Sequence, residues 1–129
     1  MIGKVIYGRL SAEPSVIAIV GQKIYPDLTP QDVQYPFCVY TIINSTAIDF
    51  KDGQSNLEEV QIQIDCYTQS YDSTQELANN IRNSLDRFVG TVNGISVQTI
   101  KYMSSESNVY NPTLNVYWTS VDFMARMKR

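Results

Sequence analysis

The chain has 129 residues, a formal net charge of −3 and a sequence pI of about 4.8. Hydrophobic residues make up 43% and charged residues 18%, which is the balance of a globular domain rather than a disordered chain. The acidic balance argues against a nucleic-acid-binding domain, because such domains gain affinity by neutralising phosphates. The length suits a single domain, residues 1–129, that can bury a core without disulfides or metals.

Two short helices are predicted at the N-terminus. Apolar residues recur every four positions through residues 2–10, which indicates a helix with one buried side. Pro14 suits the first turn of a second helix, and Gly21 is a natural residue just beyond its end. Residues 24–26 then form a short extended piece.

The best-marked feature of the sequence is a β-hairpin. Between residues 57 and 67 apolar residues alternate with polar ones, as in a half-buried strand. Asp52 and Gly53 have the composition of a two-residue turn, in which both central residues need positive φ. That turn places Ile43 opposite Ile62 and puts the apolar stripes of both strands on one face.

The same register places the two cysteines, Cys38 and Cys66, on opposite faces of the hairpin. A disulfide needs converging side chains, so two free thiols are expected. The pair also lacks CxxC spacing, which favours small apolar strand residues over a redox or metal site.

The far end of the hairpin is polar and contains a glycine. We predict that its tip, Asp49, Lys51, Asp52 and Gly53, is mobile in the free subunit and becomes ordered on assembly.

An amphipathic helix is predicted after the hairpin. Residues 70–76 offer two possible capping arrangements, Ser73 with Glu76 or Asp72 with Gln75, and the sequence does not decide between them. The polar side of this helix is neither long nor strongly basic, so we expect it to lie on a sheet and not on a membrane.

Two further strands are predicted over residues 95–103 and 114–124. In the second, the apolar positions change parity between Trp118 and Val121. This indicates either a β-bulge near residues 119–120 or a central strand covered on both faces. The expected fold is α+β: a two-layer sandwich with a mainly antiparallel four-stranded sheet and helices packed on one face.

Residues suited to catalysis are scarce. The chain has no histidine, no Gly-rich phosphate loop and no nucleophile elbow. Glu58 and Glu59 are neighbours on a strand and point to opposite faces, while Asp49 and Asp52 lack a third ligand at calcium-loop spacing. We therefore expect no enzyme activity, no cofactor and no metal. Neither a membrane-spanning run nor a signal peptide is evident, so a soluble chain made in a cytosol is expected.

The aromatic residues favour assembly. Of nine tyrosines, several lie on or beside the last strands and the start of the helix: Tyr67, Tyr71, Tyr102, Tyr110 and Tyr117. Each one could simply cap the core, but tyrosine is enriched at protein interfaces and the group favours a self-assembling surface.

One face of the predicted sheet has no helices over it. In the predicted register this open face carries Tyr40, Ile42, Gln61, Gln63 and Tyr67. Such a mixture of apolar, aromatic and amide groups resembles an interface more than a solvated surface, so we predict that these five residues contact another subunit.

Several segments, taken in order, resemble the tail-completion family of long-tailed phages, which comprises tail-terminator or head-to-tail joining proteins. The resemblance spans nearly the whole chain, and only residues 48–56 and the tail after residue 125 match loosely. It rests on these segments: residues 21–26 (GQKIYP), 36–40 (PFCVY), 60–67 (VQIQIDCY), the helix at 71–85, and 110–123.

The resemblance implies a structural virion protein that forms a homohexameric ring at the head-proximal end of the tail tube. Such a ring ends tube polymerisation and offers a joining surface to the neck of the head, and DNA passes through its lumen. Its partners would be further copies of itself, the tail-tube protein and a head-neck connector protein, with assembly in the host cytoplasm and no membrane contact. The alternatives are another neck ring, such as a head-closure or adaptor protein, and a cytosolic ligand-binding module with a pocket between helix and sheet.

Overall fold

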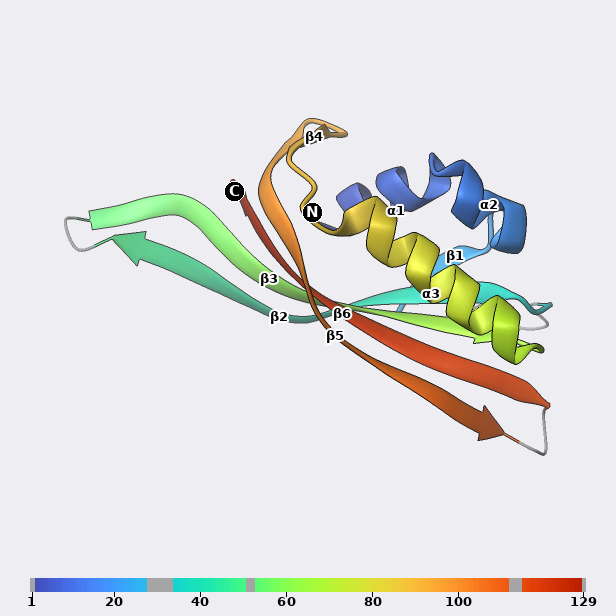
Figure 1. Cartoon of the computed structure of the whole chain (residues 1–129). Helices are drawn as coiled ribbons and strands as arrows, with labels where there is room; N and C mark the ends of the chain where they lie inside the picture. The colour runs from blue at the N-terminus through green and yellow to red at the C-terminus, as the bar shows by residue number, and fades with distance from the viewer. Residues whose placement is uncertain (1, 28–33, 51–52, 112–114, 129) are drawn as a thin grey trace.

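The computed structural model of the chain describes residues 2–27, 34–50, 53–111 and 115–128 (Figure 1). Within these ranges the chain forms three helices and six strands. In chain order they are α1 (Ile2–Ser11), α2 (Pro14–Val20), β1 (Ile24–Pro26), β2 (Phe37–Phe50), β3 (Gly53–Thr68), α3 (Tyr71–Leu85), β4 (Gly90–Val92), β5 (Ile95–Asn111) and β6 (Val116–Lys128).

The six strands form one mixed sheet in the order β1-β2-β3-β6-β5-β4. The four long strands are antiparallel to their neighbours, whereas β1 runs parallel to β2. The predicted α+β class is confirmed, but the prediction of four strands is wrong because β1 and β4 extend the sheet on either side. Each of these strands has only three residues, which is too short to show a period-2 pattern in the sequence.

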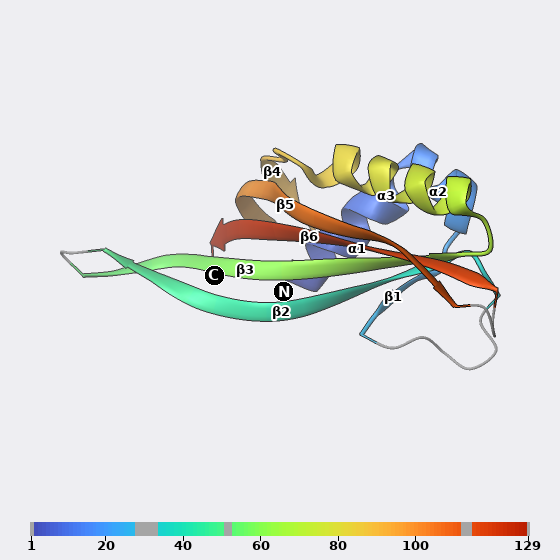
Figure 2. The same ribbon diagram turned by 60° about the horizontal axis from the view of Figure 1, so that its bottom comes forward.

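The three helices cover one face of this sheet (Figures 1 and 2). The buried apolar residues of β3 alternate, as predicted, and point to the helix side, where they meet the apolar sides of α1 and α3. The other face has no helix over it among the described residues. The largest fully buried side chains of the core are Phe123, Ile6, Leu10, Ile62, Ile64, Leu77, Ile81, Leu85 and Ile100.

The register of the β2–β3 hairpin differs from the predicted one. A β-bulge between Ile42 and Asn44 leaves Ile43 without a partner in β3, so that Ile42 and not Ile43 lies opposite Ile62. Beyond the bulge, from Asn44 to Ile48, the predicted register is confirmed. The prediction fails on the other side because one extra residue in a strand moves every following side chain to the opposite face.

The end of the hairpin also differs. Gly53 pairs with Phe50, and Asp49 pairs with Gln54. Gly53 is therefore a strand residue, and the prediction that it is the second residue of the turn is wrong. A second irregularity between Ile48 and Asp49 accommodates this change of register. Of the four predicted tip residues, Lys51 and Asp52 lie outside the described residues. In both views of the ribbon, β2 and β3 extend beyond the rest of the sheet at this end (Figures 1 and 2).

Of the predicted helix signals, those of α2 are confirmed and those of α3 are wrong. Pro14 begins α2, and Gly21 follows it with φ of 63°. Helix α3 has its N-cap at Ser70, which makes no side-chain capping bond, so neither predicted capping arrangement is used. The carbonyl of Ser70 instead accepts hydrogen bonds from the hydroxyls of Thr68 at 2.7 Å and Thr74 at 3.1 Å.

The parity change in β6 does not come from a bulge against β3, since the two strands pair without a register shift. In the pairing of β6 with β5, the register shifts come from extra residues in β5. From Thr119 onwards the odd-numbered residues of β6 face the helices, and Trp118 lies on the open face. β6 is thus a central strand with apolar residues on both faces, but helices cover only one of these faces, so neither predicted alternative holds as stated.

The corrected register places Cys38 directly opposite Cys66, on the helix side of the sheet. Both are free and fully buried. The prediction of free thiols thus agrees with the structure, but the reason given for it, opposite faces, is wrong. Burial raises the pKa of the Cys38 thiol to about 12 and raises that of Cys66 well above its usual range, so both remain protonated at neutral pH.

We predict that neither thiol reacts with a thiol reagent in the native protein at pH 8, because both are buried and protonated. After unfolding in denaturant without reductant, two thiols should react. The control is the same titration after reduction, which should give the same count. Fewer than two reactive groups in the unreduced protein would show that the opposed cysteines form a disulfide.

Candidate functional site

The open face of the sheet is the candidate functional surface. Of the five residues predicted to lie there, Gln61, Gln63 and Tyr67 do so. Tyr40 and Ile42 pair with Ile64 and Ile62 and lie on the helix side, so that part of the prediction is wrong. The β2 residues that share the open face are Phe37, Val39 and Thr41.

One end of the open face is a row of stacked aromatic rings. Phe37 of β2, Tyr67 of β3 and Trp118 of β6 lie next to one another across the sheet. Ring centroids are 5.0 Å apart between Phe37 and Tyr67 and 5.8 Å apart between Tyr67 and Trp118, and Tyr35 stacks on Phe37 at 5.2 Å. Such cross-strand aromatic pairs stabilise a sheet beyond the area that they bury.

The centre of the open face is polar. The Asp65 carboxylate accepts hydrogen bonds from the Gln63 amide at 2.9 Å and the Ser120 hydroxyl at 2.6 Å through the same oxygen. Asp65 is nearly buried although no helix covers it. These bonds fix the Gln63 amide and the Ser120 hydroxyl around the carboxylate, so the centre presents amide and hydroxyl groups beside a negative charge, and Asp122 lies next to Gln63 on β6.

The other end of the open face carries an ion pair. Arg126 of β6 donates to Glu59 of β3 at 3.3 Å, and both side chains are well exposed. An exposed pair of this kind contributes little to stability, about 0.2–1 kcal/mol. Its effect is to neutralise two charges on the open face.

Tyr67 joins the aromatic row to the polar centre. Burial, with the nearby Asp65 carboxylate as the next cause, raises the pKa of the Tyr67 phenol to about 12. The phenol therefore stays neutral at any physiological pH. Tyr67 therefore adds no pH-dependent charge to the open face at physiological pH.

Most of the other tyrosines named in the sequence lie on the helix side. Tyr71 at the start of α3 meets Tyr117 edge to face at 6.1 Å, and Tyr102 meets Phe123 in the same way at 6.1 Å. Tyr102 and Tyr117 are half-buried between helix and sheet, whereas Tyr71 is exposed. The side chain of Tyr110 lies outside the described residues.

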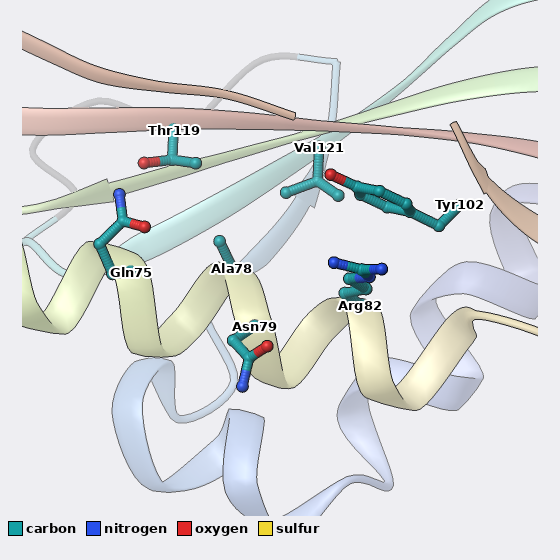
Figure 3. Close-up of a pocket in the computed structure, with 7 residues that line it drawn as sticks. All are labelled: Gln75, Ala78, Asn79, Arg82, Tyr102, Thr119 and Val121. Carbon is teal, nitrogen blue, oxygen red and sulfur yellow. The ribbon is translucent and has the colours of Figure 1, made fainter. Parts of the chain in front are cut away.

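A small pocket between α3 and the sheet tests the idea of a ligand-binding module (Figure 3). Arg82 of α3 stacks over the ring of Tyr102 at 3.9 Å on one side of this pocket, and Thr119 and Val121 of β6 form its floor. Its volume is about 140 Å³. Pockets for metabolites and cofactors usually measure about 300–1,000 Å³, so this one suits water or one small polar group.

Among the strands that the structure describes, the short outer ones leave two edges of the sheet without a partner strand for much of their length. β1 pairs only with residues 38–40 of β2, and β4 pairs only with residues 95–97 of β5. Exposed large apolar side chains lie on both free edges: Ile42 (44% exposed) and Ile43 (49%) on β2, and Met103 (47%) on β5.

The described part of the chain contains no helix that is both long and apolar enough to cross a membrane. It also contains no group of three or more acidic or cysteine side chains placed to hold a metal ion.

Comparison with known proteins identifies the family. The family model for "Tail completion protein gp17" matches residues 4–128. The chain belongs to this family. It is therefore a structural protein of phage-type tails, and the resemblance noted from its sequence segments is confirmed. A search of curated proteins finds no match.

Solved structures share its fold. One chain from the "Virion of native gene transfer agent (GTA) particle" aligns with a TM-score of 0.75 over 96% of this chain and 92% of its own length, at 13% sequence identity. A second solved chain aligns with a TM-score of 0.66 over 100% of this chain and 96% of its own, at 9% identity. At these identities the likeness establishes the fold.

Sequence reasoning missed two features of this surface. The aromatic row was missed although its signal was present. The apolar even-numbered residues at the start of β6, which were read as a sign of a possible bulge, lie on the open face, where Trp118 stacks on Tyr67. The two free edges were missed because β1 and β4 were not recognised as strands, and the extent of an edge depends on where they stop.

The aromatic row predicts an energetic coupling between Tyr67 and Trp118. In a double-mutant cycle with Tyr67→Ala and Trp118→Ala, the free energies of unfolding should show a coupling of about 0.5–1.5 kcal/mol, since the rings stack. The control cycle uses Tyr67→Ala with Tyr102→Ala, which lie on opposite faces and should be additive within about 0.5 kcal/mol. Chemical denaturation measures both. Additive losses at Tyr67 and Trp118 would contradict the stack.

Proposed function

We propose that this protein forms a ring of six copies that ends the tail tube at its head-proximal end and joins it to the neck of the head. The observation that carries the proposal is the family match, which covers nearly the whole chain. The fold shared with a chain from a gene transfer agent virion supports the same setting. The ring, its copy number and the terminator role are the steps that go beyond family membership.

The surface chemistry is compatible with a ring through which DNA passes. The chain has a net charge of −3, and the open face carries amides, hydroxyls and the carboxylates of Asp65 and Asp122, with the Arg126–Glu59 ion pair at one end. A surface of this kind does not attract phosphates, so it lets DNA slide without holding it.

We also propose that the five residues predicted at the subunit interface contact a neighbouring copy. They fall into two groups. Tyr40 and Ile42 belong to β2, the strand whose outer edge is free beyond Tyr40. Gln61, Gln63 and Tyr67 lie on the open face. The tail-tube protein and the head-neck connector are the proposed partners at the two ends of the ring, in the virion and, during assembly, in the host cytoplasm.

Polymerising tail-tube subunits test the function. In the presence of the protein, tubes should stop growing and carry a density cap at one end in electron micrographs, and only capped tubes should join to heads. The control is an unrelated acidic protein of similar mass. Tubes of normal length that join heads without the protein would rule out the terminator role. Binding to heads but not to tube ends would favour a head-closure or adaptor protein.

The hairpin tip provides a second prediction. Amide hydrogen exchange around Asp49 and Gly53 should be fast in the free subunit and slower in the ring, because the end of the hairpin extends beyond the sheet and gains contacts only on assembly. The reference is β3 between residues 60 and 66, which should be protected in both states. Strong protection of the tip in the isolated subunit would contradict the prediction.

A further inference from the structure

The two free edges of the sheet are long and lie on opposite sides of it. The outer edge of β2 is free over residues 41–50, beyond its pairing with β1. The outer edge of β5 is free over residues 103–111. Before that point β4 pairs with residues 95–97, Ile100 exchanges backbone hydrogen bonds with Arg87 and Phe88, and the Tyr102 N–H donates to the Asp86 carboxylate. Each free edge presents a row of backbone N–H and C=O groups that none of the described strands pairs with on that side.

Neither edge is well protected against pairing. Proteins usually protect an edge strand with proline, charged residues or a covering segment. The two free edges contain no proline, and Asp49 and Glu106 are their only charged residues. Both carry bulges, but exposed apolar residues, Ile43 and Met103, lie at two of these bulges.

We propose that the free edge of β5 in one copy pairs with the free edge of β2 in the next copy. The sheets of successive copies then join into one closed barrel, with the helices outside and the open face lining the lumen. This inference rests on the proposed ring, and it names the surfaces that build it and the face that DNA meets.

Strand direction permits this pairing. β2 is antiparallel to β3, β3 to β6, and β6 to β5, so β2 and β5 run in opposite directions. Rotation about an axis that runs along the barrel preserves the direction of each strand relative to that axis. The β5 and β2 edges of neighbouring copies therefore meet as an antiparallel pair, the arrangement found between the other long strands.

The two edges are also offset along the strands by the amount that a closed barrel needs. The β2 edge lies level with residues 53–63 of β3, while the β5 edge, followed through β6, lies level with Gln63 to Thr68 and slightly beyond. A shift of about six residues, or about 20 Å, across four strands that are together about 19 Å wide brings the far ends of the two edges level, and the β2 edge then covers the whole free part of β5. The edges of neighbours align if the strands tilt by about 45°, at the upper end of the usual 35–45° for barrels.

The direction of the offset decides which face is inside. Figure 1 shows α3 in front of the sheet, with β3 running from left to right and β2, β3, β6 and β5 following from top to bottom at its right-hand end. With the same view turned so that β3 points upwards, β2 is on the left, β5 is on the right, and the β5 edge lies higher. This is also the right-handed crossover expected for β3–α3–β5.

Barrel strands lean to the right when seen from outside, because adjacent strands are twisted by about −20 to −25°. Because the strands lean, the copy on the right in the ring is shifted upwards along the strand direction relative to the copy on the left. Its β2 edge therefore meets the β5 edge of the left-hand copy only if that β5 edge lies higher than the β2 edge within one copy. This is the offset observed when the sheet is seen from the helix side. With the helices inside, the offset would require the opposite twist.

Edge variants test the pairing. Lysine on an edge strand opposes strand addition, so Ile43→Lys and Met103→Lys should each leave a folded monomer by sedimentation velocity, at concentrations where the wild type forms rings. Mixed together, they should give a one-to-one dimer and nothing larger, because each retains the intact edge that the other lacks. Asn83→Lys is the control: Asn83 is exposed on α3, away from both free edges, so this variant should assemble normally. Circular dichroism checks that all three variants fold.

The outcomes distinguish a failure of the edge pairing from a failure of the proposed ring. If the wild type forms rings and either edge variant assembles like it, the edge pairing is wrong while the ring stands. If the mixture of variants stays monomeric, the edges do not pair with each other. If the wild type forms no ring alone or on tube ends, the proposed function itself fails.

A second measurement tests the orientation. Gln61→Cys on the open face and Asn83→Cys on α3 are each labelled with a biotin maleimide, and the buried native cysteines do not compete. In the assembled ring, streptavidin should bind the Asn83→Cys label and at least tenfold less of the Gln61→Cys label. In the Ile43→Lys background both labels should bind. The reverse preference in the ring would show that the helices line the lumen.

Discussion

The pairing between β3 and β6 is the interaction on which the rest of the molecule depends. Over its whole length the two strands pair without a register shift. Their side chains therefore keep strict alternation, and Ile62, Ile64, Val121 and Phe123 form an apolar floor under the helices. The same alternation sends a second set of side chains, with Asp65 among them, to the open face. A slip of one residue here would exchange the core for the surface.

The irregularities of the sheet lie in the outer long strands. β2 has a bulge at Ile43, and β5 changes register three times along β6. These strands tolerate extra residues because each has a free edge for much of its length, where no second partner fixes the register. A regular centre with irregular edges lets the sheet twist and curl, since bulges increase local twist. The bulges thus favour curl, while the points at which the outer partners of β2 and β5 stop set the extent of the free edges.

The sequence predicted what depends on local patterns. The alternation of β3, the stop at Gly21 and the helix after Thr68 follow from side-chain periodicity and turn chemistry, and the structure contains all three. The face of Tyr40 could not be predicted, because its parity depends on the bulge at Ile43, and no residue type there marks an insertion. The aromatic row also depends on which strands are neighbours, and the pairing of β3 with β6 brings together segments far apart in the chain.

That long-range pairing has a consequence for how the protein is made. Leu57 lies opposite Lys128, so the central ladder cannot form until the last strand has been synthesised. Until then β3 exposes an apolar strand on one side, and α3 has only part of the surface on which it packs. Pairings between distant segments are slow to form, and unpaired strands aggregate while they wait. The nascent chain therefore needs protection during synthesis, and the arrival of β6 is the step that ends this vulnerable period.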